Sequence, residues 1–119
     1  MMEISEALPQ SKAGILTIHD VFSDGKRIGH IEVGYIQENE VKTFRKYTKR
    51  KLSVGQPYGT QLFIDTKESG VTTDKLGKKG LAEIVFAMKE KFKGLEDRDI
   101  YILELTDTGK KIVCRASGL

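Results

Sequence analysis

Residues 14–36 read GILTIHDVFSDGKRIGHIEVGYI, and this stretch decides the fold class. Apolar and polar side chains alternate over residues 14–22 and again over residues 27–36, which is the pattern of half-buried β-strands. The Asp24-Gly25 pair between the two runs is typical of a two-residue hairpin turn. The stretch therefore predicts an antiparallel β-hairpin at the start of a sheet.

A two-residue turn at Asp24-Gly25 makes residues whose numbers sum to 49 face each other. His19 and His30, the only histidines, then lie opposite each other, with Glu32 on the same face. These three side chains form either a candidate metal site or an ordinary packed cluster. The side chains expected to face the core are those of Leu16, Ile18, Phe22, Ile31 and Val33.

The rest of the chain adds two helices and three strands to this hairpin. A helix is expected over 40–52 and a longer one ending near residue 93, with strands over 58–66, 99–106 and 110–115. The order β-β-α-β-α-β-β predicts an α+β fold, a largely antiparallel sheet with helices packed on one face. Residues 1–119 are expected to form one domain, and residues 1–12 a flexible arm.

Composition excludes several classes of protein. No apolar run approaches the roughly 18 residues that a membrane-spanning helix needs, and the first residues lack the pattern of a signal peptide. Cys114 is the only cysteine, so no intrachain disulfide and no cysteine-based zinc site is expected. We therefore expect a cytoplasmic protein that does not contact membranes.

Residues 41–52, VKTFRKYTKRKL, hold six of the twenty basic residues and no acid. On a helix, most of the basic side chains fall opposite an apolar stripe, which is typical of contact with an anionic partner. We expect a small nucleic-acid-binding or regulatory protein that binds DNA or RNA here, without catalysis or a cofactor. The alternative is a protein-interaction or inhibitor module that binds an acidic protein surface. The binding residues expected are Lys42, Arg45, Lys46, Lys49, Arg50 and Lys51, with Tyr47 as a stacking aromatic.

Residues 74–80, DKLGKKG, precede the longer helix. Glycines at a helix start let backbone N–H groups approach an anion, so this loop is a candidate phosphate site. The alternative is an ordinary helix start with solvated lysines. The residues expected to contact the anion are Gly77, Lys78, Lys79 and Gly80.

The segment LGKKGLAEIVFAMKEKF, followed by YILELTDTG, resembles the acetyl-CoA-binding core of the Gcn5-related N-acetyltransferases. That family opens its long helix with Gln/Arg-x-x-Gly-x-Gly/Ala. Gly80 and Ala82 match the last two positions, whereas Gly77 stands where the family has Gln or Arg. Over about residues 74–118, the resemblance implies a small acyl-CoA-binding protein, with acetyl-CoA as its cofactor and the pyrophosphate held at the helix start.

Overall fold

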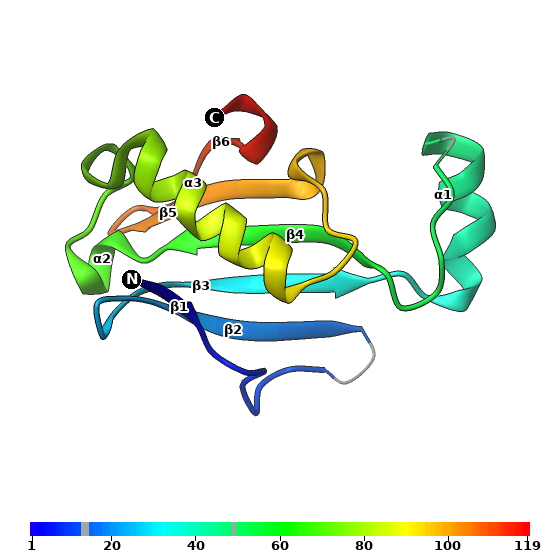
Figure 1. Cartoon of the computed structure of the whole chain (residues 1–119), viewed down its shortest axis with the longest axis horizontal. Helices are drawn as coiled ribbons and strands as arrows, with labels where there is room; N and C mark the ends of the chain where they lie inside the picture. Colours follow the sequence, from blue (N-terminus) through cyan, green and yellow to red (C-terminus); the bar gives the residue numbers. More distant parts are fainter. Residues whose placement is uncertain (13–14, 49) are drawn as a thin grey trace.

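Six strands form one sheet in the order β1-β2-β3-β4-β5-β6 in the computed structural model, which describes residues 1–12, 15–48 and 50–119. Neighbouring strands run antiparallel except β4 and β5, which are parallel. The predicted α+β class and largely antiparallel sheet are confirmed (Figure 1). The strands are β1 (Met2–Ile4), β2 (Leu16–Ser23), β3 (Lys26–Tyr35), β4 (Pro57–Ile64), β5 (Ile100–Thr106) and β6 (Gly109–Arg115).

The described helices occupy two separate places on this sheet. The long helix crosses one face of the sheet (Figure 1). The first helix projects beyond one end of the strands and has no buried residue. The predicted packing of helices on one face of the sheet therefore holds for the long helix but not for the first one. The helices are α1 (Val41–Thr48), α2 (Thr66–Ser69) and α3 (Thr73–Lys91), and the 3-10 turns are η1 (Glu38–Glu40), η2 (Asp97–Asp99) and η3 (Ala116–Gly118).

The hydrophobic core lies between α3 and the sheet. The apolar side chains of α3 recur at helical spacing, and each one buried contributes roughly 1.5–3 kcal/mol relative to exposure. Thr72 caps the helix by accepting the Lys75 N–H at 3.0 Å. The core includes Leu81, Ile84, Val85, Met88 and Phe92, as predicted, together with Ile31, Val33, Leu62, Ile64, Ile100 and Ile102 from the sheet.

The first hairpin has the predicted turn but not the predicted register. Asp24 and Gly25 both have positive φ, as a type I′ turn requires, and Ser23 pairs with Lys26. A β-bulge then adds one residue to β3, so the remaining pairs have numbers that sum to 50. Because a one-residue shift moves every side chain to the other face, the predicted pairing beyond the bulge is wrong.

The shift changes which β2 side chains reach the core. His19 and Val21 are buried, whereas Leu16, Ile18 and Phe22 stay partly exposed. The prediction holds on β3, where Ile31 and Val33 are both fully buried.

The first twelve residues were expected to form a loose arm, and this prediction is wrong. β1 pairs with the end of β2, with Met2 opposite Ser23. Ser5 and Leu8 donate backbone hydrogen bonds to β2 carbonyls at 2.9 and 2.8 Å. Backbone pairing thus continues along the sheet edge well beyond β1.

Within the described residues, no helix is long and apolar enough to cross a bilayer.

Candidate functional site

The helix α1 belongs to an excursion between β3 and β4. Ile36 closes the base of this excursion, since its N–H donates to Gln56 at 3.0 Å and its carbonyl accepts from Gly55 at 2.8 Å. On the inner side of α1, the Phe44 ring packs against Tyr58 with centroids 4.5 Å apart. The apolar side of α1 therefore faces the sheet end, and its basic side faces solvent.

The predicted basic arc is exposed along α1. Lys42, Arg45 and Lys46 are exposed, and the Tyr47 side chain is 75% exposed. Lys51, beyond the helix, is exposed as well. Across the described part of the chain, no ion pair includes any of these four cations. Lys49, also predicted to bind, lies outside the described residues.

Arg50 differs from the rest of the predicted set. Its side chain is only 12% exposed, and its guanidinium donates two hydrogen bonds to Asp99 at 2.7 and 2.8 Å. A third, to Glu96, measures 3.2 Å. Hydrogen bonding to Asp99 raises the pKa of Arg50, so the group stays charged. The expectation that Arg50 lies on the exposed arc is wrong, because Arg50 lies outside α1 and its side chain pairs with Asp99 of η2.

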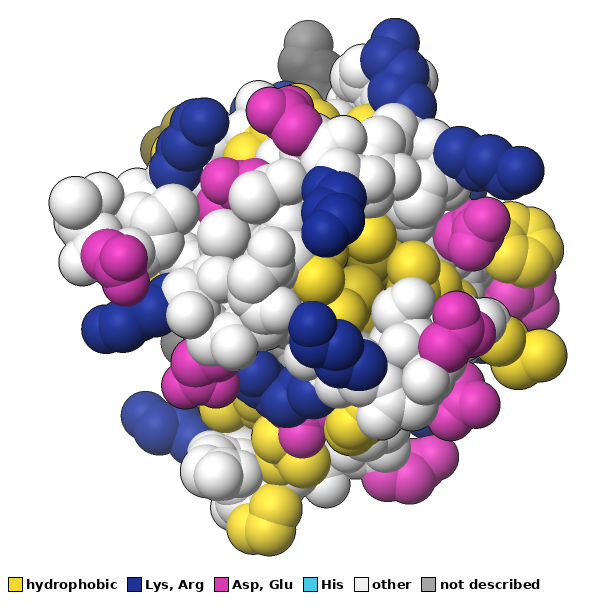
Figure 2. Space-filling model, turned by 90° about the vertical axis from the view of Figure 1, so that its left-hand side faces the viewer, with side chains coloured by type: hydrophobic (Ala, Val, Ile, Leu, Met, Phe, Trp, Pro, Cys, Tyr) yellow, Lys and Arg dark blue, Asp and Glu magenta, His cyan; other side chains and the backbone are white. Residues whose placement is uncertain are grey.

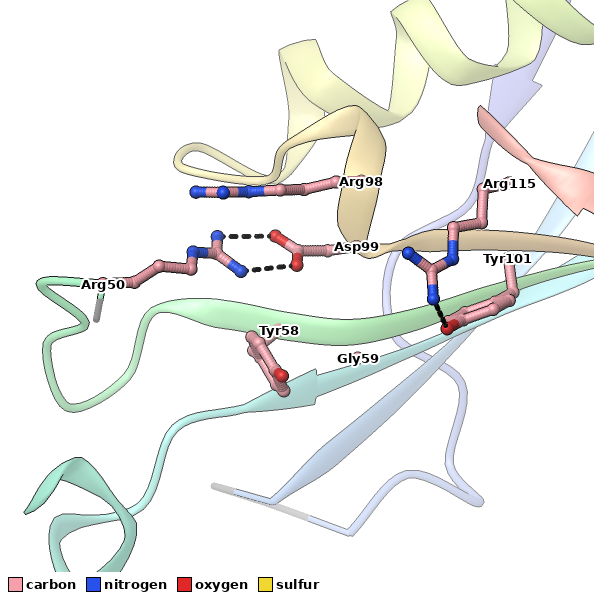
Figure 3. Close-up of a pocket in the computed structure, with 7 residues that line it drawn as sticks. All are labelled: Arg50, Tyr58, Gly59, Arg98, Asp99, Tyr101 and Arg115. Carbon is pink, nitrogen blue, oxygen red and sulfur yellow. Dashed lines mark hydrogen bonds and ion pairs between the residues drawn. The ribbon is translucent and has the colours of Figure 1, made fainter. Parts of the chain in front are cut away.

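Arg50 forms one wall of a hollow of about 330 Å³ at the end of the parallel β4–β5 pair (Figure 3). Arg115 forms another wall; it is opposite Tyr101 in the β5–β6 register and donates to the Tyr101 hydroxyl at 2.6 Å. Its guanidinium also lies 4.9 Å from the Tyr101 ring. We call this hollow the arginine–tyrosine pocket, and it is lined by Arg50, Tyr58, Gly59, Arg98, Asp99, Tyr101 and Arg115.

The three arginines of the arginine–tyrosine pocket differ in whether a carboxylate balances their charge. Arg50 is neutralised by Asp99, and Arg98 donates to Glu96 at 2.6 Å. Among the described residues, no ion pair includes Arg115, so its guanidinium keeps an uncompensated charge. A guanidinium beside a phenol ring suits a ligand that combines an anionic group with a flat ring.

Sequence reasoning missed Arg98, Tyr101 and Arg115. They come from η2, β5 and β6, far along the chain from α1. The one local signal was an arginine or tyrosine near a strand end, which many proteins have without a site. Tertiary structure brings them beside α1, because Phe44 packs on Tyr58, which also lines the pocket.

The predicted phosphate site at Gly77–Gly80 lies within α3 rather than in a loop before it. Gly77 has φ of 69°, which kinks the helix, and a Cβ at Gly80 would lie 3.2 Å from the Leu76 Cβ. The backbone geometry at Gly77 and the close packing at Gly80 therefore explain both glycines without a bound anion. Lys78 and Lys79 are exposed. The first part of α3, to which they belong, lies at the opposite end of the molecule from α1 (Figure 1). Figure 2 shows that end, where basic and acidic side chains are interspersed.

The predicted metal set of His19, His30 and Glu32 is wrong. Because of the register shift, His19 faces Ile31 and the two histidines project from opposite faces of the sheet. His19 is buried, and its ring lies 4.8 Å from that of Phe92. His30 Nε2 is 3.4 Å from a Glu32 oxygen. No cluster of three or more His, Cys, Asp or Glu that could hold a metal ion occurs within the described ranges.

Family models, curated proteins and solved structures were all compared with this chain, and none matches it. The resemblance to the Gcn5-related N-acetyltransferases therefore rests on the residues quoted above.

Proposed function

We propose that the protein binds single-stranded DNA or RNA through α1 and the arginine–tyrosine pocket beside it. The observation that carries the proposal is the exposed arc of Lys42, Arg45 and Lys46, which has no carboxylate partner in the described structure. Unpaired cations along one helix face are suited to phosphates spaced along a strand. Arg50, by contrast, pairs with Asp99 and stabilises the fold beside this surface. It is not a phosphate ligand.

Aromatic side chains favour a single strand over a duplex. Tyr47 is 75% exposed on α1, and Tyr58 and Tyr101 line the pocket. Stacking of a base on an aromatic ring requires an unstacked base, which a duplex does not offer, and is worth about 1–3 kcal/mol per base. Arg115 is placed to bind the phosphate of a nucleotide whose base enters the pocket.

The experiment is a salt series of oligonucleotide binding, followed by fluorescence anisotropy. Four to five phosphate contacts predict a log–log slope of affinity against salt of about −3 on a single strand. The double variant Lys42→Gln/Lys46→Gln should weaken binding and reduce the slope by about 1.4, since each lost contact removes about 0.7. Tyr47→Ala should weaken binding with little change in slope.

The matched control is Lys67→Gln/Lys75→Gln, which removes the same charge from two exposed lysines on α2 and at the start of α3, at the other end of the molecule from α1. It should bind like the wild type. Absence of binding at low salt, or equal weakening by both double variants, would contradict the proposal. Polyglutamate that competes as well as the oligonucleotide would favour an acidic protein surface as the partner.

A second candidate function is acyl-CoA binding at the start of α3. It is supported by the parallel pairing of β4 and β5, which α3 connects, and by the kink at Gly77. A hollow of about 390 Å³ adjoins Gly77 and Lys78. Acetyl-CoA should then raise the melting temperature, with amide shifts centred on residues 77–82. A flat titration would remove this candidate.

A further inference from the structure

The outward side of α3 carries an apolar surface that the proposed function does not use. Phe86 is 67% exposed there, although its neighbour Val85 is buried in the core. Beside it lies a hollow of about 480 Å³, lined by Met1, Met2, Lys79, Ala82, Glu83, Phe86 and Ala87. An exposed aromatic ring next to an apolar hollow is typical of an interaction surface.

The charges bordering this surface have both signs. Lys79 and Glu90 are 11 residues apart, close to three helical turns, so they lie on one stripe of α3 to the same side of Phe86. Both are exposed; Glu90 lies 3.9 Å from Lys93, and no described ion pair includes Lys79. When two copies of this stripe lie antiparallel, the lysine of each copy meets the glutamate of the other.

We propose that a second copy of this chain docks antiparallel along α3. Placing Lys79 of each copy beside Glu90 of the other makes residues whose numbers sum to 169 lie level with each other. Phe86 of one copy then lies level with Glu83 of the other, in the middle of the hollow between Lys79 and Ala87. Each copy inserts one ring into its partner, which is the symmetry of a two-fold interface.

A second copy fits this surface better than a nucleic acid, because the border includes carboxylates that would repel phosphates. The surface is also separate from α1, which projects from the end of the sheet (Figure 1). A dimer formed through α3 therefore leaves the basic arc of α1 open to its own partner.

Sedimentation of the full chain over a concentration series tests the proposal. The wild type should dimerise with rising concentration, and Phe86→Ser should weaken the dimer by roughly thirty-fold or more, as expected for a central anchor residue. Tyr47→Ser, which removes a similarly exposed aromatic ring outside the surface, should dimerise like the wild type. Circular dichroism checks that each variant is folded.

The charge pair tests the antiparallel arrangement. Lys79→Glu and Glu90→Lys should each weaken self-association, because each puts like charges together twice. An equimolar mixture of the two variants should form a heterodimer, since mixing restores two opposite-charge pairs. A wild type that stays monomeric at millimolar concentration, or a mixture that associates no better than its components, would overturn the proposal.

Discussion

Replacing Arg50 by alanine tests whether part of the basic stretch is structural. The Asp99 side chain is 6% exposed and that of Arg50 12%, and their two hydrogen bonds measure 2.7 and 2.8 Å. Without the guanidinium, the Asp99 carboxylate stays buried and uncompensated. Breaking one side of such a pair costs about 3–5 kcal/mol. We take about 3 kcal/mol, since the adjoining pocket admits water, and expect a drop in melting temperature of about 12 °C.

Thermal and urea unfolding measure this loss, with Arg45→Ala as the matched control. Arg45 is exposed on α1, so its replacement should change the free energy of unfolding by less than about 0.5 kcal/mol. In a double-mutant cycle with Asp99→Ala, the coupling energy should be about 2–3 kcal/mol. If Arg50→Ala is as stable as Arg45→Ala but loses oligonucleotide affinity, the structural role is refuted and Arg50 is a phosphate ligand.

Two further predictions concern the sheet. Glu104 accepts the N–H and the hydroxyl of Thr73 at 2.6 and 2.5 Å, and these bonds, the side-chain one first, hold its pKa below the usual range. Because the folded pKa is the lower one, this stabilisation is present above about pH 4.3 and is lost below it. The advantage of wild type over Glu104→Gln in urea unfolding should therefore shrink on acidification; a constant difference would contradict this. Gly29→Ala should cost more than about 3 kcal/mol or prevent folding, because its Cβ would lie 2.0 Å from the Phe63 carbonyl oxygen, whereas Gly25→Ala, in open space at positive φ, should cost about 1–2 kcal/mol. Equal losses in chemical denaturation would show that close packing at Gly29 is not the cause.

The sequence by itself determined most of the elements and their order, but it did not reveal β1 or α2. Alternation over residues 14–36 and the Asp24-Gly25 pair predicted the hairpin and its turn, and both are present. Helical spacing identified the buried face of α3, and the same arithmetic identified Lys42 and Lys46 as exposed on α1. These features are local, because periodicity and turn chemistry act over a few residues.

Only the tertiary structure decided the register of the first hairpin. Beyond the bulge, Gly29 stands where a Cβ would lie 2.0 Å from the Phe63 carbonyl oxygen of β4. That approach depends on a strand some thirty residues further along, so no pattern within the hairpin reveals it. The separation of His19 and His30 onto opposite faces follows directly from it.

The arginine–tyrosine pocket also depends on contacts between distant segments. Asp99 lies 49 residues from Arg50, and Arg115 meets Tyr101 only through the β5–β6 pairing. On a helical wheel Arg50 belongs with the exposed lysines. In the folded chain its side chain is only 12% exposed, because Arg50 lies outside α1 and its guanidinium pairs with Asp99 of η2. Helical periodicity predicts exposure only for residues within the helix. Contacts with distant segments help to decide where the helix ends.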